Sequence, residues 1–117
     1  MPTPFFIRIY GTREGGPLEQ SMEVLAQKLE SVPQLYFEWD GSFVWVGRES
    51  DDDTSWQFDG MIYDLGTQIQ YIELKGMWHP QAWQRWLACL EIDSAFVHDI
   101  TSGNWHSISQ YSPSHPV

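Results

Sequence analysis

Residues 56–76 read WQFDGMIYDLGTQIQYIELKG and contain two segments with the composition of β-strands. Aromatic and β-branched residues are frequent in Trp56–Tyr63 and in Gln68–Lys75, and turn-forming residues lie between them. The stretch therefore predicts two consecutive strands joined around Leu65-Gly66. Its charged residues Asp59, Glu73 and Lys75 form the only set in the chain whose type and spacing suggest chemistry.

Upstream of this stretch the pattern predicts a strand, a helix and a hairpin. Apolar residues alternate with other residues over Pro4–Tyr10, as in a strand with one buried face. They recur at helical spacing over Leu18–Val32, where Pro17 suits the first helical position. Asp40-Gly41 favours a two-residue hairpin turn. The strands that this turn would join are Leu35–Trp39 and Phe43–Val46.

Downstream, the sequence predicts a helix over Pro80–Leu90 and a last hairpin formed by Phe96–Ile100 and Trp105–Gln110. The expected fold class is α+β, with one mostly antiparallel sheet and two helices packed on one face. The expected element order is β-α-β-β-β-β-α-β-β. Residues 1–111 are expected to form a single domain, and residues 112–117, with two prolines, a flexible C-terminal tail.

The chain of 117 residues is strongly acidic: 16 Asp and Glu residues outnumber 6 Lys and Arg residues, for a formal net charge of −10. This charge disfavours nucleic acid and anionic lipid as partners, because both would be repelled. Cys89 is the only cysteine, which suits a reducing compartment. With no secretory signal and no apolar run of ~20 residues, a cytoplasmic protein that does not enter the membrane is expected.

The register of the first hairpin predicts which aromatic side chains reach the surface. A two-residue loop places alternate residues of the two strands on the same face. The expected core residues are Leu35, Phe37, Val44 and Val46. The opposite face is expected to carry Tyr36, Glu38, Phe43 and Trp45. Three rings together form an apolar patch that another molecule or element must cover, and the run Asp51–Asp53 adds negative charge beside it.

Asp59, Glu73 and Lys75 form the candidate catalytic site. Two carboxylates and a lysine on neighbouring strands can hold Mg²⁺ or Mn²⁺ and activate a water molecule. The order helix, several strands, helix, strand from Leu18 to Phe96, with Asp59 and Glu73-x-Lys75 on consecutive strands, resembles the core of the PD-(D/E)xK nuclease superfamily. The resemblance implies that Asp59 and Glu73 bind the metal and that Lys75 orients the water. Phe58 replaces the proline of the family's motif.

The loop between the two strands decides whether the carboxylates meet. A loop of two or four residues at Leu65-Gly66 places Phe58 opposite Glu73 and turns Asp59 to the other side of the sheet. A three-residue loop, Leu65-Gly66-Thr67, places Asp59 directly opposite Glu73. The residues of the loop fit either register.

The favoured interpretation is a small acidic, non-enzymatic domain that binds another protein, or a second copy of itself, without a cofactor. The residues expected to make the contact are Tyr36, Glu38, Phe43 and Trp45, because aromatic side chains anchor interfaces and charges select partners. The alternative is a metal-dependent phosphodiesterase or nuclease-like enzyme that uses Asp59, Glu73 and Lys75 with Mg²⁺ or Mn²⁺. A third interpretation is an aromatic groove for a small ligand or a sugar.

Overall fold

Seven strands and two α-helices form the part of the chain described by the computed structural model, residues 3–49, 54–92 and 94–113. In chain order they are β1 (Pro4–Tyr10), α1 (Met22–Glu30), β2 (Leu35–Phe37), β3 (Ser42–Glu49), β4 (Thr54–Leu65), β5 (Gln68–Met77), α2 (Pro80–Leu90), β6 (Phe96–Asp99) and β7 (Trp105–Ser107), followed by the short 3₁₀ helix η1 (Ile108–Gln110). All strands join one sheet in which neighbours are antiparallel. The expected α+β class, with one antiparallel sheet and two helices, is confirmed.

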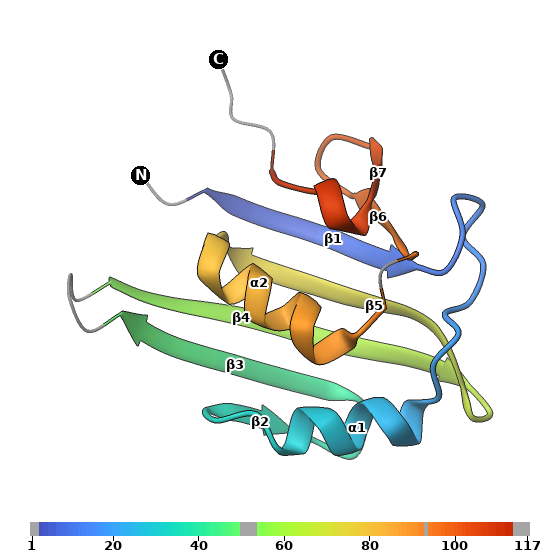
Figure 1. Ribbon diagram of the computed structural model, residues 1–117, viewed down its shortest axis with the longest axis horizontal. Coiled ribbons are helices and arrows are strands. Elements are labelled where there is room, and N and C mark those ends of the chain that lie inside the picture. Colours follow the sequence, from blue (N-terminus) through green and yellow to red (C-terminus); the bar gives the residue numbers. More distant parts are fainter. Residues whose placement is uncertain (1–2, 50–53, 93, 114–117) are drawn as a thin grey trace.

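The strands lie in the order β2-β3-β4-β5-β1-β6-β7 (Figure 1). The first strand of the chain therefore inserts between β5 and β6, near the middle of the sheet, where Ile7 and Ile9 are fully buried. Both outermost strands, β2 and β7, have only three residues. Short edge strands expose little unpaired backbone to other chains.

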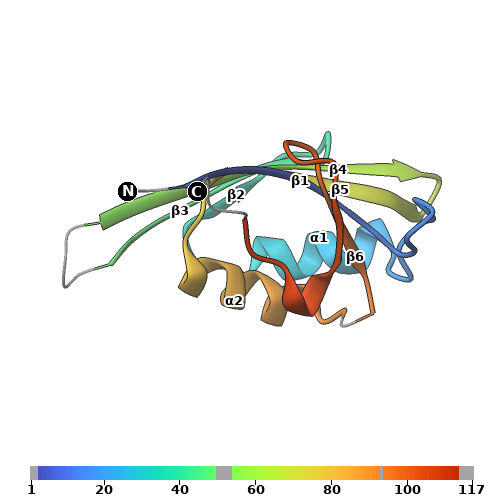
Figure 2. The same cartoon turned by 90° about the horizontal axis from the view of Figure 1, so that it is seen from above.

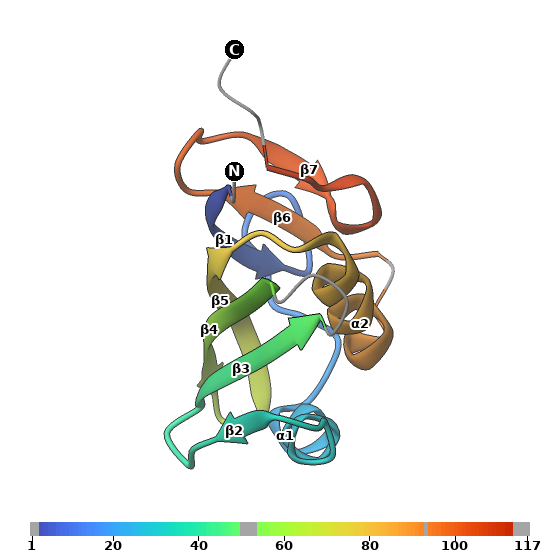
Figure 3. The same ribbon diagram turned by 90° about the vertical axis from the view of Figure 1, so that its left-hand side faces the viewer.

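Both helices and η1 lie on one side of the curved sheet, and no helix of the described chain lies on the other side (Figures 2 and 3). Because strand side chains alternate between the two sides, every strand contributes residues to both. The side with the helices holds the hydrophobic core. We call the side without helices the open face.

Helix α2 covers the middle of the sheet with large apolar side chains. Trp83, Trp86 and Leu90 are buried, and the ring of Trp86 stacks on Phe43 of β3 with 5.7 Å between centroids. The helix begins where predicted, because Pro80 occupies the first turn and Nδ1 of His79 accepts a hydrogen bond from the Ala82 N–H at 3.2 Å.

Helix α1 is shorter than the helix expected over Leu18–Val32. It begins at Met22 because Ser21 is the N-cap, whose hydroxyl accepts a hydrogen bond from the Val24 N–H at 3.2 Å. The preceding segment is held by the sheet instead, since the Leu18 N–H donates to the Ile69 carbonyl at 3.0 Å. The expected helical position of Pro17 is therefore wrong. Leu18 is still buried, so the apolar pattern identified a core residue but not the helix start.

The turn between β2 and β3 has three residues rather than two. Phe37 pairs with Phe43, and the Glu38 N–H donates to the Ser42 carbonyl at 2.9 Å, so the loop consists of Trp39, Asp40 and Gly41. Gly41 has a φ of +95° and donates its N–H to the Glu38 carbonyl at 3.1 Å. A glycine at the last position of a three-residue loop takes this left-handed conformation. A side chain there would also crowd β4, because a Cβ at residue 41 would lie 2.6 Å from the Ile62 carbonyl oxygen.

The additional turn residue exchanges the two faces of β3. Phe43 and Trp45 are 2% and 4% exposed and lie in the core, whereas Tyr36 is 65% exposed on the open face. The expected core positions of Val44 and Val46 are wrong, and so is the expected position of Phe43 and Trp45 beside Tyr36. Helix α2 packs on Phe43 through the stacked ring of Trp86.

Two expected segments fall wholly or partly outside the described residues. They are the acidic run Asp51–Asp53 and, within the expected tail, residues 114–117. Pro113 is buried, and the hydroxyl of Tyr111, two residues earlier in the chain, donates to the Asp99 carboxylate at 2.8 Å. None of the helices in the described ranges has the length and apolar character needed to cross a membrane.

Leu25→Ala should lower the free energy of unfolding by ~2–5 kcal/mol, because truncating a buried leucine leaves a cavity. Leu25 is fully buried on α1, whereas the neighbouring Val24 is exposed. Val24→Ala is therefore the control and should change the stability by less than about 0.5 kcal/mol. Urea denaturation measures both variants, and a loss within the control's range would place Leu25 outside the core.

Phe43→Ala and Val44→Ala test the register of β3. We expect a loss of ~3–5 kcal/mol for Phe43→Ala, which removes the ring stacked on Trp86. Val44 faces the open side and is exposed, so Val44→Ala should cost less than about 1 kcal/mol. The same denaturation experiment compares them, and a larger loss for Val44→Ala would contradict the observed register.

Candidate functional site

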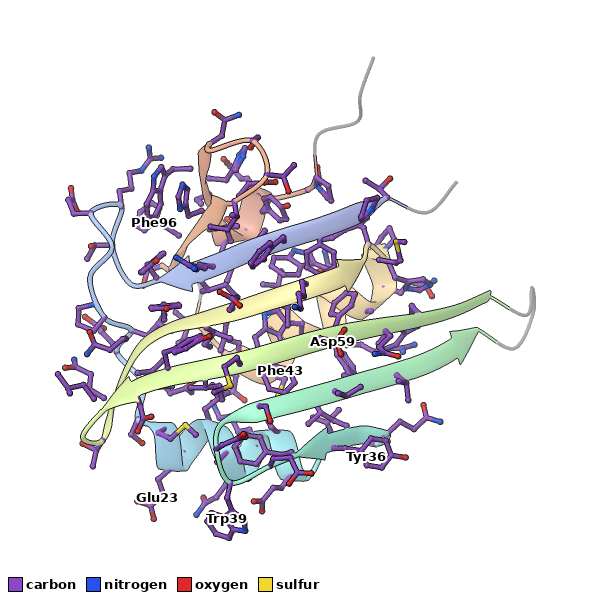
Figure 4. All side chains as sticks on the ribbon, turned by 180° about the vertical axis from the view of Figure 1, so that it is seen from behind. Glu23, Tyr36, Trp39, Phe43, Asp59 and Phe96 are labelled. Atoms are coloured by element: carbon purple, nitrogen blue, oxygen red, sulfur yellow. The ribbon has the colours of Figure 1, made fainter. Side chains whose placement is uncertain are left out.

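The open face carries all three residues of the candidate catalytic site. Asp59 lies directly opposite Lys75 in the β4–β5 pair, and Glu73 lies two residues before Lys75. These positions alternate with the buried Phe58 and Leu74, so their side chains point away from the helices. Figure 4 looks onto this face, with Asp59 labelled on β4. The two carboxylates therefore share a face as diagonal neighbours.

A β-bulge produces this register, which neither expected loop length gives. Leu65 pairs with Gln68 across the two-residue loop Gly66-Thr67. The pairing then shifts by one residue between Tyr63 and Asp64, so that β5 contributes one extra residue. This extra residue restores the alternation that brings Asp59 and Glu73 to the same side of the sheet.

The Glu73 carboxylate already has a cationic partner. Nε of Arg8, on β1, donates a hydrogen bond to Oε2 of Glu73 at 3.0 Å, and this bond raises the pKa of the Arg8 guanidinium. The guanidinium also lies 5.2 Å from the centroid of the Tyr71 ring. Asp59 accepts a hydrogen bond from the side-chain amide of Gln57 at 3.0 Å. A metal ion at Glu73 would therefore have to compete with Arg8.

No three His, Cys, Asp or Glu side chains among the described residues are grouped so that they could hold a metal ion. Asp59 and Lys75 instead line an open pocket of about 570 Å³, together with Gln57 and Gly76. Gly76 lets β5 approach β4 closely at the pocket, because a Cβ at this position would overlap the Gln57 carbonyl oxygen. The pocket offers a carboxylate, an amide and an ammonium group to a small polar ligand.

An aromatic row crosses five strands of the open face. It consists of Tyr63 on β4, Tyr71 on β5, Tyr10 on β1, Trp105 on β7 and His98 on β6. Neighbouring ring centroids in this order are 4.6, 5.2, 5.4 and 4.5 Å apart. Arg8 contacts the row at Tyr71. The row and Arg8 together make the open face aromatic at one end.

Part of the signal for this row is present in the sequence. Tyr10, Tyr63 and Tyr71 each adjoin an isoleucine that is fully or almost fully buried, so strand alternation alone turns the three tyrosines outward. Their contact depends on β1 lying beside β5. Hydrophobic alternation does not predict that β1 inserts beside β5, and the row was therefore not predicted from the sequence.

The residues expected to form an interaction surface are divided between surface and core. Tyr36 and Glu38 are exposed. Trp45 lies on the side of the sheet that carries the helices, where its ring packs edge-on against Trp56 with 4.8 Å between centroids. Phe43 lies on the same side and stacks on Trp86 of α2. The four residues Tyr36, Glu38, Phe43 and Trp45 therefore do not form one exposed surface.

The three-residue turn instead exposes Trp39, which is 97% accessible to solvent. Trp39 borders a pocket of about 590 Å³ that lies between α1 and the turns β2–β3 and β4–β5. Figure 4 shows Trp39 projecting beyond the sheet on the side of Glu23 of α1. The acidic residues in the lining are Glu23, Glu30, Asp40 and Asp64. We call this site, lined by Trp39, Phe37, Met22 and the four carboxylates, the Trp39 pocket.

No model of a protein family, no curated protein and no solved structure matches the chain. The two candidate surfaces are therefore distinguished by their own chemistry. At the centre of the open face, Arg8 and Lys75 balance Asp59 and Glu73. The Trp39 pocket, by contrast, is strongly acidic.

Calorimetric titration with Mg²⁺ or Mn²⁺ tests the candidate metal ligands. Because Arg8 holds Glu73, we expect the same heats for the wild type and for Asp59→Ala. Arg8→Gln frees Glu73 and serves as the second variant. Saturable binding by the wild type that Asp59→Ala abolishes, and that Arg8→Gln strengthens, would contradict this expectation and support a metal site at Asp59 and Glu73.

Proposed function

We propose that this chain is a non-enzymatic interaction domain that binds a protein partner through its open face. The observation that carries the proposal is the aromatic row on a sheet face that no helix of the described chain covers (Figures 2 and 4). Tyr63 is 37% exposed and the other four rings are partly exposed. Burial of this remaining aromatic surface by another molecule is favourable.

The composition of the open face supports a protein as the partner. Interfaces are enriched in tyrosine, tryptophan, methionine and arginine, and the open face presents Tyr36, Tyr63, Met61 and Arg8. Tyrosine gives a large, rigid contact area with a polar hydroxyl, at a low cost in side-chain entropy. The stacking of Tyr63 on Tyr71 occupies faces of both rings, which leaves edges and hydroxyl groups for a broad contact.

Charge supports a protein over a nucleic acid. The net charge of −10 repels a phosphate backbone. The central charges of the open face compensate each other, since Arg8 pairs with Glu73 and Lys75 lies opposite Asp59. A partner with a similarly mixed surface can therefore approach this face more easily than the acidic remainder of the molecule.

A metal-dependent phosphodiesterase or nuclease-like activity is the alternative. One observation favours it. The side chains of Asp59, Glu73 and Lys75 lie on one face of the sheet, and Asp59 and Lys75 also line a pocket. In this alternative, Asp59 and Glu73 would hold Mg²⁺ or Mn²⁺ and Lys75 would orient a water molecule. The ion pair between Arg8 and Glu73 and the acidity of the chain both favour the interaction domain.

Site-specific photo-crosslinking in the cells that produce this chain tests the proposal. A photoreactive phenylalanine analogue replaces Tyr36 or Tyr63 on the open face, and Gln84 on the exposed side of α2 is the control position. We expect a discrete adduct with a protein from positions 36 and 63 but not from position 84. A second copy of the chain as partner would give an adduct of twice the mass.

Two results of this experiment would contradict the proposal. One is the lack of an adduct at both open-face positions, although the variants fold and react with light. The other is the same set of adducts from all three positions, which would indicate random collisions.

A further inference from the structure

The Trp39 pocket combines an apolar surface with an acidic lining. Met22, Ala26 and Phe37 contribute apolar atoms, and Trp39 adds an indole ring that is almost fully exposed. Among the described residues that line the pocket, four are carboxylates and none is a lysine or arginine. Lys28, the lysine of α1, is not in the lining and pairs with Glu91 at 3.4 Å.

The turn fixes one carboxylate at the edge of the pocket. Oδ1 of Asp40 accepts hydrogen bonds from the Ser42 hydroxyl at 2.6 Å and from the Ser42 N–H at 2.9 Å. The hydroxyl bond contributes most to lowering the pKa of the Asp40 carboxyl. Gly41 closes the same turn in its left-handed conformation. Trp39, immediately before Asp40, is therefore carried by a turn with a defined geometry.

We propose that the Trp39 pocket binds a lysine or arginine side chain presented by a basic segment of a partner protein. Such side chains have an apolar stem and a cationic head, which match the apolar and acidic parts of the pocket. The face of a tryptophan attracts a cation more strongly than any other aromatic side chain. Charge complementarity with the four carboxylates selects a cation over a neutral apolar residue.

The spacing of the carboxylates argues for an extended cation rather than a metal ion. The four acidic side chains line a pocket of about 590 Å³. No three of them are grouped closely enough to hold a metal, since no such group exists among the described residues. A lysine or arginine side chain can interact with separated carboxylates through its several N–H donors.

Two capped peptides that differ in one side chain test this proposal. Acetyl-Gly-Lys-Gly-amide carries an ammonium group, and acetyl-Gly-norleucine-Gly-amide has the same stem without the charge. Each is titrated into ¹⁵N-labelled protein at low ionic strength, where screening is weakest. The Trp39 indole signal is assigned by its loss in Trp39→Phe. We expect the lysine peptide to shift this signal and the amides of Glu23, Asp64 and Thr67 with one saturation curve, and the norleucine peptide to leave them unchanged.

Two double variants that remove the same number of negative charges distinguish binding in the pocket from non-specific attraction to the acidic protein. Glu23→Gln/Glu30→Gln should weaken binding of the lysine peptide about threefold or more, and Trp39→Ala about fivefold. Glu14→Gln/Glu19→Gln removes the same charge at exposed residues outside the lining and should change the affinity by less than about twofold. Urea midpoints equal to that of the wild type will show that the variants fold.

Equal weakening by the two double variants would overturn the proposal, as would equal binding of the two peptides or shifts spread evenly over the acidic surface. The Trp39 pocket shares no lining residue with the aromatic row. A negative result here would therefore leave the proposal for the open face intact, and failure of the crosslinking experiment would leave the pocket intact.

Discussion

The packing of Phe43 of β3 against Trp86 of α2 determines which side of the sheet becomes the core. The two rings stack at 21° with 5.7 Å between centroids. This contact requires the three-residue turn that ends at Gly41, because a two-residue turn would send Phe43 to the other side. Antiparallel pairing then transmits the alternation across the sheet, from Trp45 to Phe58 and on to Gly76. The polar and aromatic residues of the open face follow from that choice.

The parts of the fold that depend on local sequence could be predicted. Strand β1 and helix α2 have the predicted bounds, because Pro4–Tyr10 alternates cleanly and His79-Pro80 marks a helix start. Helix α1 could not be delimited, because the competing signals of Pro17 and Ser21 are decided by a backbone hydrogen bond from Leu18 to β5. That bond exists only in the assembled sheet.

The strand registers were predicted incorrectly because a register depends on contacts between residues that are far apart in the chain. Asp40-Gly41 fits both a two-residue and a three-residue turn, and only the packing of Phe43 and Trp45 distinguishes them. No pattern in the sequence predicts the bulge near Tyr63, yet the bulge brings Asp59 and Glu73 to one face of the sheet. The long-range partner of Glu73, Arg8, lies 65 residues away in the chain. A candidate site on a sheet therefore depends on non-local pairing that periodicity does not contain.

The molecule has two chemically different surfaces, which suit different contacts. The open face is broad and aromatic, and its central charges compensate each other, as in the pair of Arg8 with Glu73. The Trp39 pocket is small and acidic, and it lies at the end of the molecule formed by α1 and two turns. The turn displaces Trp39 from the strand and places Phe43 in the core, whereas the aromatic row follows from strand alternation and from the pairing of β1 with β5.

The most direct test of this account is the effect of a soluble paramagnetic agent on the side-chain NMR signals of the isolated, monomeric protein. Such an agent broadens the signals of groups that solvent reaches. The account predicts strong broadening for Tyr36, Val44 and Trp39, and sharp signals for Phe43 and Trp45. Broadening of Phe43 and Trp45 together with protection of Val44 would show that the faces are reversed, and would contradict the account of both surfaces.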